Sequence, residues 1–598
     1  MTLYPLFILE GRQIRFAYDA NGNITALTSP KGAEHTFDYN GVNLPTAYLS
    51  ALGARTRYEY DAQRRLVKLV RPSGKSVEYL YGDGRLQAIK MPEGETHYRY
   101  ACGSLPQKIV RAGESVRYEY DGTLTMKVHF EGLLDTAIAY GYDDGMRPVS
   151  MTYAGEETAY GYDDDGLLSR AGTLQISRDF RFRRVTHYEE AGYSRYLMRN
   201  GFGEPSFSIS DDYVYGLMRD IAGRINVKIE YTGAKLYLYR YVYDADGRLS
   251  KVYTNGKETE RYTYDDNGNR LEATVGGKTY TARHTLDDQF EVYGDNTYRY
   301  DADGYLVEKS TLEGTTIYTY DTLGALTDVT LPNGMHIRYH QNALGQRVAK
   351  EVDGTVKERY LWKDLTTLLA VYDGDGNVVQ RFEYADERVP FAMTMKGRRY
   401  FLHYDHLGSL RTVTDTNHTV VKEILYDAFG NIVQESSATL PIPFGFAGGL
   451  HDRETGLVHF GYREYDPFTG KWTAKDPILF EGGDVNLYGY VLNDPVNLVD
   501  PVGLFTPAAG VGAGALTGFF VGVFDAYMNA NCWQEVFQII MFDTATGALS
   551  GFLASGGGML GAIAGEAGGI GLNAMTGANW VPSVSPCKKP EEEPETCE

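Results

Sequence analysis

Four Asp-Pro pairs lie close together in the sequence, at Asp466, Asp476, Asp494 and Asp500. An Asp-Pro pair usually starts a turn, because the aspartate side chain bonds to nearby backbone groups and proline fixes its own φ. Two carboxyl groups held close together have a second use, since they cannot both ionise cheaply and therefore share a proton. One can then activate water as a general base while the other acts as a general acid. Spacing alone does not separate turn formation from hydrolysis.

The segment HYDHLG places two imidazoles and a carboxylate near one another in the sequence, at His403, Asp405 and His406. Such side chains bind metal ions, but their setting in a strand and turn favours structural side chains of a repeat over metal ligands. No Walker-type glycine loop or dinucleotide-binding fingerprint occurs, because the closely spaced glycines lie in predicted hairpins and not between a strand and a helix. We therefore expect no metal and no cofactor.

A tyrosine repeat defines the elements that must position these residues. From Tyr18 to Tyr162, tyrosines follow one another at intervals of 19 to 22 residues, and the pattern returns from Tyr243 onward. Typical units read RYVYDADGRLSKVY, RYTYDDNGNRLEATV and YTYDTLGALTDVT. In each unit, Tyr-x-Tyr puts two rings on one face of a strand, and Asp-x-x-Gly supplies a turn before a leucine-bearing strand. Each unit is predicted to be a β-hairpin.

These hairpins predict a mainly β fold. The 49 Tyr and 68 Gly favour strands punctuated by turns, and the 43% hydrophobic content supplies ample material for a core. So many hairpins exceed the roughly ten strands that an open twisted sheet tolerates, so the sheet must coil, close or stack. Between residues 170 and 235 the tyrosine period fades while strand-like alternation continues. This stretch indicates degenerate repeats and not a new domain.

The tyrosine-aspartate units resemble the YD repeats of the Rhs family, which includes bacterial Rhs polymorphic toxins, the C components of Tc toxin complexes and, more distantly, teneurins. The resemblance covers about residues 10–504. It implies a long antiparallel sheet that spirals into a hollow shell. We assign residues 1–446 to this YD-repeat β-shell.

Residues 447–504 resemble the terminal signature of the Rhs core almost throughout. The matching segments include ETGL, YREYDPFTGKW, GGDVNLYGY and the closing DPVGL. The sequence departs from the pattern at DPILFEGG, where relatives commonly carry a glycine before the leucine and where Phe480 is an additional bulky residue. We expect this departure to alter the local turn.

In self-processing relatives, a pair of aspartates in this signature cuts the chain directly after its final Gly-Leu. Carried over by position, the resemblance implies that Asp476 and Asp500 form the catalytic pair of an aspartyl-type protease that acts once on its own chain. It also implies that Arg463 assists the pair and that the bond between Leu504 and Phe505 is cut.

The repeat is absent from residues 505–598. Glycines there recur in four-residue steps from Gly510 to Gly522 and from Gly557 to Gly569. This spacing predicts closely packed helices whose small residues stack on one face. We interpret the segment as a candidate effector or the helical lead-in to a toxin, with membrane association of the released tail as a further hypothesis.

Composition excludes several other function classes. The net charge of −21 argues against nucleic-acid binding, which needs clustered Lys and Arg. The start, MTLYPLFILEGRQIRF, has neither basic residues before its apolar stretch nor a small-residue cleavage site, so we predict no signal peptide. The chain has four scattered cysteines, too few for a disulfide framework: Cys102, Cys532, Cys587 and Cys597. We expect synthesis in a bacterial cytoplasm, followed by secretion or delivery.

Two classes of function fit the sequence. The first is an Rhs-type toxin-delivery shell that encloses its own C-terminal segment and releases it by autoproteolysis after Leu504. Its partners would include an upstream shell or delivery-machine subunit and an immunity protein. The alternative is a non-enzymatic YD-repeat scaffold for cell-surface adhesion or carbohydrate binding, in which the terminal signature only closes the sheet.

Overall fold

The chain folds as a single coiled β-sheet around a small internal plug. The computed structural model describes residues 4–9, 12–101, 105–233, 235–437 and 440–505. Within these ranges a 43-stranded sheet runs in chain order, and each strand pairs antiparallel with the strands before and after it. The predicted mainly β fold is confirmed. The predicted glycine-rich helices of residues 506–598 lie outside the described residues.

We call β1 to β28 the first circuit and β29 to β43 the second circuit. The first circuit contains β1 (Tyr4–Leu9), β2 (Arg12–Tyr18), β3 (Ile24–Thr28), β4 (Glu34–Tyr39), β5 (Pro45–Leu49), β6 (Arg55–Tyr60), β7 (Leu66–Val70), β8 (Ser76–Gly82), β9 (Arg85–Met91), β10 (Gly94–Tyr100), β11 (Pro106–Arg111), β12 (Glu114–Asp121), β13 (Leu124–Glu131), β14 (Thr136–Tyr142), β15 (Pro148–Tyr153), β16 (Glu156–Tyr162), β17 (Leu168–Ala171), β18 (Leu174–Arg178), β19 (Val185–Glu190), β20 (Tyr193–Arg199), β21 (Pro205–Ser210), β22 (Tyr213–Arg219), β23 (Ile225–Thr232), β24 (Lys235–Tyr243), β25 (Leu249–Thr254), β26 (Lys257–Tyr264), β27 (Arg270–Val275) and β28 (Lys278–His284). The second circuit contains β29 (Phe290–Tyr293), β30 (Asn296–Tyr300), β31 (Leu306–Thr311), β32 (Gly314–Tyr320), β33 (Leu326–Thr330), β34 (His336–Gln341), β35 (Arg347–Val352), β36 (Thr355–Trp362), β37 (Leu368–Asp373), β38 (Val378–Glu383), β39 (Ala392–Met395), β40 (Arg398–Tyr404), β41 (Leu410–Asp415), β42 (Val420–Tyr426) and β43 (Ile432–Glu435).

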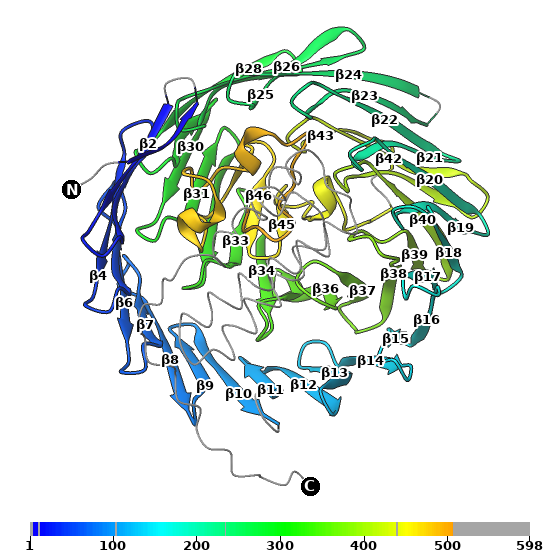
Figure 1. Ribbon diagram of the computed structural model, residues 1–598, viewed down its shortest axis with the longest axis horizontal. Helices are drawn as coiled ribbons and strands as arrows, with labels where there is room; N and C mark the ends of the chain where they lie inside the picture. The colour runs from blue at the N-terminus through cyan, green and yellow to red at the C-terminus, as the bar shows by residue number, and fades with distance from the viewer. Residues whose placement is uncertain (1–3, 10–11, 102–104, 234, 438–439, 506–598) are drawn as a thin grey trace, which may run out of the picture.

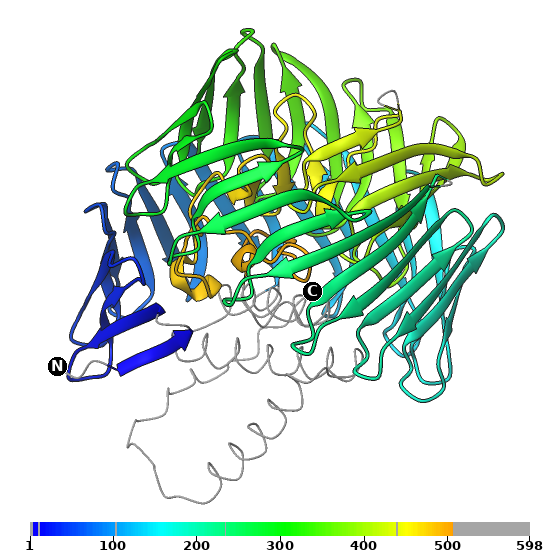
Figure 2. The same cartoon turned by 90° about the horizontal axis from the view of Figure 1, so that it is seen from above.

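The two circuits form a spiral in which the second lies against the first (Figure 1). The Ser50 hydroxyl donates to Asp287 at 2.7 Å, across 237 residues of chain. Further along, the hydroxyls of Thr232 and Thr412 lie 2.7 Å apart, across only 180 residues. The second circuit therefore spans the same arc with fewer residues than the first, and the shell narrows toward one end (Figure 2).

The aspartate of each YD unit closes its hairpin turn. In the unit that ends β26, Asp265 Oδ1 accepts the backbone N–H groups of Asn267 and Asn269 at 2.9 and 2.8 Å. Gly268, between them, has a φ of +80° and donates its N–H to the Asp265 carbonyl oxygen. Glycine adopts this left-handed backbone without steric cost, which explains the fixed Asp-x-x-Gly spacing.

The tyrosine of each unit has a different task. The strand register shifts at this residue in hairpin after hairpin, as at Ala17/Tyr18, Asp38/Tyr39, Glu59/Tyr60 and Thr263/Tyr264. Such bulges bend and twist a sheet. In eight of the described hairpins the tyrosine hydroxyl also donates to a backbone carbonyl of the preceding hairpin, as Tyr264 does to Leu249 at 2.8 Å. The same bond recurs from Tyr81 to Leu66, Tyr100 to Leu86, Tyr120 to Pro106, Tyr142 to Thr125, Tyr162 to Pro148, Tyr243 to Ile225 and Tyr384 to Leu368.

The stretch where the tyrosine period fades is part of the same sheet, which confirms that it contains degenerate repeats. Strands β17 to β23 continue the antiparallel order without a break. Arginine takes the place of tyrosine in this stretch. Arg219 lies at a register shift, precedes Asp220, and donates from Nη1 to the Pro205 carbonyl at 2.8 Å, as a repeat tyrosine would. A guanidinium therefore substitutes for the phenol as the link to the preceding hairpin.

Residues 440–505, which we call the terminal plug, leave the sheet and fill the centre of the ring (Figure 1). The plug holds a four-stranded sheet of β44 (Leu450–His451), β45 (Val458–Phe460), β46 (Arg463–Asp466) and β47 (Lys471–Trp472). It also holds three short 3-10 helices, η1 (Phe446–Gly448), η2 (Leu479–Gly482) and η3 (Val491–Asn493). No helix in the described part of the chain is long and apolar enough to cross a bilayer.

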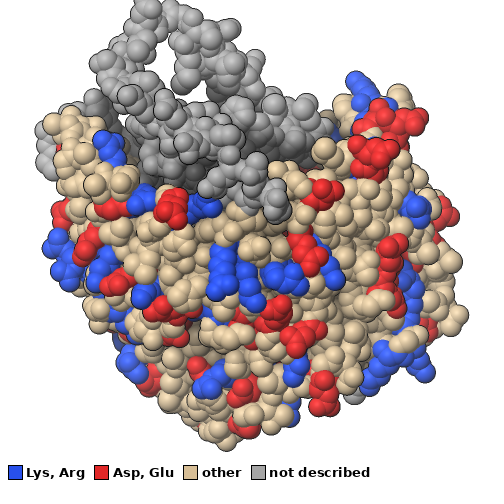
Figure 3. Space-filling view, turned by 90° about the horizontal axis from the view of Figure 1, so that it is seen from below, with Lys and Arg blue, Asp and Glu red and all other residues tan. Residues whose placement is uncertain are grey.

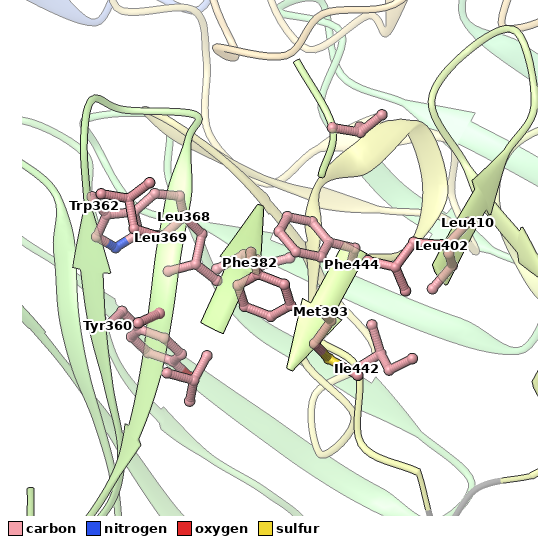
Figure 4. Packing of buried hydrophobic residues seen from close by; sticks show 14 of the residues in the cluster. Tyr360, Trp362, Leu368, Leu369, Phe382, Met393, Leu402, Leu410, Ile442 and Phe444 are labelled. Carbon is pink, nitrogen blue, oxygen red and sulfur yellow. The ribbon is translucent and has the colours of Figure 1, made fainter. Parts of the chain in front are cut away.

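The first residues of the plug pack against the second circuit in an apolar core. Phe444 packs edge-on against Phe382 of β38, with ring centroids 4.9 Å apart, and Ile442 lies beside them (Figure 4). Farther along, the Leu306 N–H donates to the Thr473 carbonyl oxygen at 2.9 Å, which joins the plug to β31. The plug is thus held by the sheet that surrounds it.

We predict that loss of one repeat hydroxyl loosens its hairpin locally. Tyr384→Phe leaves the buried Leu368 carbonyl without its 2.7 Å donor. This should cost about 1–2 kcal/mol and speed amide exchange in β37 and β38 roughly 5- to 30-fold. Hydrogen exchange with mass spectrometry measures the effect. Tyr196→Phe is the control, because that half-exposed hydroxyl makes no hydrogen bond within the described ranges; equal effects of both variants would contradict the assigned role.

Candidate active site

The plug brings the three residues singled out in the sequence into contact. Arg463 begins β46, Asp476 lies between β47 and η2, and Asp500 lies near the end of the described chain. All three are at least 95% buried. Arg463 Nη2 lies 2.8 Å from Asp476 Oδ2 and 3.4 Å from Asp500 Oδ2. One guanidinium nitrogen therefore bridges the two carboxyl groups.

Asp500 accepts hydrogen bonds from the backbone of the predicted cleavage segment. Its Oδ1 accepts the backbone N–H groups of Gly503 and Leu504 at 2.9 and 3.0 Å. Its Oδ2 accepts the N–H of Phe505 at 2.9 Å. Arg463 Nε donates to the Gly503 carbonyl oxygen, which holds the same segment from the other side. The amide nitrogen of the Leu504–Phe505 bond consequently lies against a carboxyl oxygen.

Asp476 approaches this segment across Gly482. The Asp476 N–H donates to the Leu487 carbonyl oxygen, and its Oδ1 accepts the Ile478 N–H at 3.0 Å, which fixes the carboxyl group. A Cβ atom added to Gly482 would lie 2.9 Å from Asp476 Oδ2 and 2.9 Å from the Phe505 carbonyl oxygen. The absence of a side chain at Gly482 allows this close approach.

Burial raises the pKa of both carboxyl groups. For Asp476, burial outweighs the opposing effect of Arg463 and raises the pKa to about 6. Burial also raises the pKa of Asp500, although Arg463 and the backbone N–H groups of residues 503–505 act in the other direction. Both carboxyl groups are therefore easier to protonate than exposed aspartates, and the Asp500 charge adds to the raised pKa of Asp476.

Residues outside the predicted set complete the site. Trp472 is fully buried and lies under the Arg463 guanidinium, with the ring centroid 4.3 Å from its central carbon. Burial raises the pKa of Asp484 to about 7, and the nearby Asp476 charge contributes to this shift. Sequence reasoning assigned no role to Trp472, Gly482 or Asp484, although all three lie within its terminal signature. The only feature of the sequence that pointed to these three residues was their position within the terminal signature.

The departure at Phe480 has a structural use. Residues 479–482 form η2, and Phe480 packs against His35 of β4 and Tyr48 of β5, with centroids 5.0 and 6.2 Å away. Leu479 and Gly483 have φ values of +53° and +86°, so the turn is tight. The extra ring therefore ties the loop after Asp476 to the first circuit.

The two other Asp-Pro aspartates lie outside the pair. Asp466 accepts the Phe468 N–H at 3.0 Å and contacts Lys309 Nζ at 3.2 Å. Asp494 accepts the side-chain amide of Asn497 at 2.8 Å. Both serve as turn residues.

The HYDHLG side chains make contacts within the shell. His403 contacts the hydroxyls of Ser210 and Thr414, His406 contacts the Val496 carbonyl oxygen, and Asp405 accepts the N–H groups of its own turn. Within the described part of the chain, no three His, Cys, Asp or Glu side chains gather as metal ligands.

On the face in Figure 3, basic and acidic side chains are interspersed.

A coiled sheet of YD hairpins around a terminal plug defines a YD-repeat shell protein. The chain belongs to the teneurin YD-shell family, whose model matches residues 6–496. The Rhs/YD-repeat resemblance is thereby confirmed.

Curated relatives include teneurin-3 of Mus musculus, 27% identical over 552 residues, and teneurin-1 of Homo sapiens, 27% identical over 498 residues. These matches cover 83% and 79% of this chain but 20% and 17% of the relatives. The chain thus spans about a fifth of the length of the curated relatives it matches.

Solved structures share the fold. The crystal structure of TcdB2-TccC3 matches with a TM-score of 0.56 and 16% sequence identity, over 82% of this chain and 30% of that one. The Photorhabdus luminescens Tc holotoxin pore, solved with a mutation in TccC3, matches with the same TM-score and identity over 82% of this chain and 29% of that one.

We predict that Arg463→Met makes the plug less stable as pH rises. Arg463 lowers the pKa of both aspartates, so its removal raises both values further above their unfolded ones. The folded state then binds extra protons, and stability falls as pH rises through these higher pKa values. The free energy of unfolding of Arg463→Met should fall as pH rises above about 6, by roughly 1.4 kcal/mol for each unit by which the pKa values rise. Urea unfolding at several pH values measures this fall.

The exposed Arg338, paired with Asp328 at 2.8 Å, provides the control for this measurement. Arg338→Met should leave the pH dependence of the urea midpoint unchanged. A pH-independent midpoint in Arg463→Met would show that this cation does not hold the two aspartates.

Proposed function

We propose that this YD-repeat shell cuts its own chain once, between Leu504 and Phe505, and so frees the segment that follows. The observation that carries the proposal is the hydrogen bond from the Phe505 amide to Asp500, with Asp476 joined to Asp500 through Arg463. These contacts support the proposal, because they hold two carboxyl groups close to the segment that the terminal signature implies is cut.

The proposed reaction is hydrolysis by water. In the reacting state Asp476 is ionised and Asp500 is protonated. Asp476 removes a proton from water as the oxygen attacks the Leu504 carbonyl carbon, and Asp500 delivers its own proton to the Phe505 nitrogen. The carbon–nitrogen bond breaks to leave a carboxylate on Leu504 and an amine on Phe505. Arg463 holds the Gly503 carbonyl and both carboxyl groups, so it fixes the bond against the pair. Burial removes competing solvent and strengthens these interactions.

The wider role that we propose is delivery. Cleavage inside a shell separates the cargo from its container without releasing it, so residues 505–598 would remain enclosed until the shell opens. The chain would be made in a bacterial cytoplasm and exported with a further shell or delivery subunit, alongside an immunity protein in the producing cell. Support for this role comes from the shared fold of the TcdB2-TccC3 structures and from the plug at the cleavage segment.

We predict that purified folded protein is found as two fragments. Denaturing mass spectrometry should detect one ending at Leu504 and one beginning at Phe505. Asp476→Asn and Asp500→Asn should each abolish cleavage while keeping the β circular dichroism spectrum, because an amide cannot exchange the required proton. An uncut wild-type chain would exclude the protease and favour the scaffold alternative. Cleavage at full rate in either variant would assign it to another site.

We also predict that Gly482→Ala slows cleavage. The added methyl group would lie 2.9 Å from both Asp476 Oδ2 and the Phe505 carbonyl oxygen, so those groups must separate. A displacement on the ångström scale should slow the reaction about 100-fold. Refolding of uncut chain followed by gel electrophoresis gives the rate. Gly41→Ala is the matched control, since its Cβ meets nothing within 4 Å; equal rates in both variants would reject this approach geometry.

A further inference from the structure

A cavity of about 720 Å³ opens where the two circuits meet the plug. Its lining comes from three separate parts of the chain. His35 and Tyr48 belong to the first circuit, Asp287 to the turn between the circuits, Tyr300 to the second circuit, and Lys475 to the plug. None of these groups contributes to the proposed cleavage chemistry, so the cavity needs its own explanation.

Lys475 differs from every other buried lysine of the described chain. Five lysines are at least 92% buried: Lys228, Lys350, Lys422, Lys471 and Lys475. The first four have their ammonium groups bonded to carboxylates or backbone and amide oxygens. Lys475, 8% exposed, makes no hydrogen bond or ion pair to any of the described residues. The Lys475 ammonium therefore faces the cavity without a protein partner among the described residues. A cation largely removed from water is costly unless it is paired, so a partner inside the cavity would be favourable.

Lys471 provides a close comparison within the same plug. Its ammonium donates to Asn269 Oδ1 at 2.6 Å and to the Asp288 carbonyl oxygen at 2.8 Å. Burial lowers the pKa of Lys471 and of Lys475 to about 8 alike. The two lysines therefore share desolvation and differ in partners. Only Lys475 borders the cavity, and the Tyr48 ring lies 6.0 Å from its Nζ.

The nearby carboxylates attract the Lys475 ammonium without forming an ion pair with it. Against the larger effect of burial, the charges of Asp303, Asp287 and Asp301 raise its pKa. Hydrogen bonds hold these carboxylates in the wall, since Asp287 accepts the Ser50 hydroxyl and the Leu52 N–H, Asp303 accepts the N–H and hydroxyl of Ser73, and Asp301 accepts backbone N–H groups of its own turn. The hydrogen-bonding positions of the Lys475 ammonium are therefore open to a group inside the cavity.

We propose that this cavity binds a small anion, carrying a carboxylate or phosphate group, through an ion pair with Lys475. Arg57 and Arg71 add positive charge to the lining, and Arg55 there is paired with Asp38 at 2.8 Å. Asp287, Asp288 and Asp301 contribute negative charge, while Tyr48 and Tyr488 supply aromatic and hydroxyl surface. The chain has a net charge of −21, so anion binding at this site depends on the charged groups that line the cavity and not on the net charge. Gly304 keeps the cavity floor open, because a Cβ there would lie 3.2 Å from the Lys475 side chain.

Titration calorimetry of the intact protein with inorganic phosphate, and separately with citrate, tests the proposal. We expect saturable binding of one anion per chain, at least tenfold weaker in Lys475→Met and largely retained in Lys475→Arg. Lys257→Met, which removes the same charge from an exposed position, should bind like the wild type. Absence of saturable binding by the wild type, or equal binding by Lys475→Met, would overturn the proposal.

Chemical labelling gives a second measurement that does not require a variant. Pyridoxal phosphate, an anionic aldehyde, followed by borohydride should label Lys475 ahead of Lys471, and phosphate or citrate should protect Lys475. Peptide mass spectrometry locates the label. Labelling of Lys475 that neither anion reduces would contradict a bound anion at this residue. Cleavage after Leu504 plays no part in either readout, so the two proposals fail separately.

Discussion

The bond between a repeat tyrosine and the preceding hairpin is the interaction on which the rest of this molecule depends. In eight of the described hairpins a repeat hydroxyl, such as that of Tyr264 on the Leu249 carbonyl, bonds one hairpin to the preceding one, in most cases beside a bulge that bends the sheet. Because the same bond and bulge recur, the bend accumulates in one direction until the sheet meets itself. The contacts between circuits, such as Ser50 with Asp287, are then a consequence of uniform curvature.

Curvature also encloses the plug and removes its charged side chains from water. A short segment with little regular structure could not keep Arg463, Asp476 and Asp500 dry by itself. Inside the sheet, Lys471 bonds to the turn around Asn269, and Phe480 packs on the first circuit, so the loops on both sides of Asp476 are fixed to the wall. The resulting desolvation is the main cause of the raised pKa values of both aspartates.

Local sequence predicts much of the fold and little of the site. The hairpins follow from Tyr-Asp and glycine spacing, because each turn is built from residues adjacent in sequence. Closure into a shell followed only from the Rhs resemblance, since contacts such as Thr232 with Thr412 join distant residues. The sequence pattern did not reveal that Arg219 replaces a repeat tyrosine. A guanidinium and a phenol can donate the same hydrogen bond, but they belong to chemically different side chains.

The site residues were likewise inferred from resemblance, and their grouping is a three-dimensional fact. No spacing rule connects Gly482 with the carbonyl of Phe505, or distinguishes the unpaired Lys475 from the paired Lys471.

Strict chain order among the 43 strands has a mechanical consequence. A pull on β43 or β1 loads one hairpin ladder at a time, as in unzipping, and does not shear many strands together. Such a sheet unravels under a smaller force applied at its edge than is needed to shear many strands together.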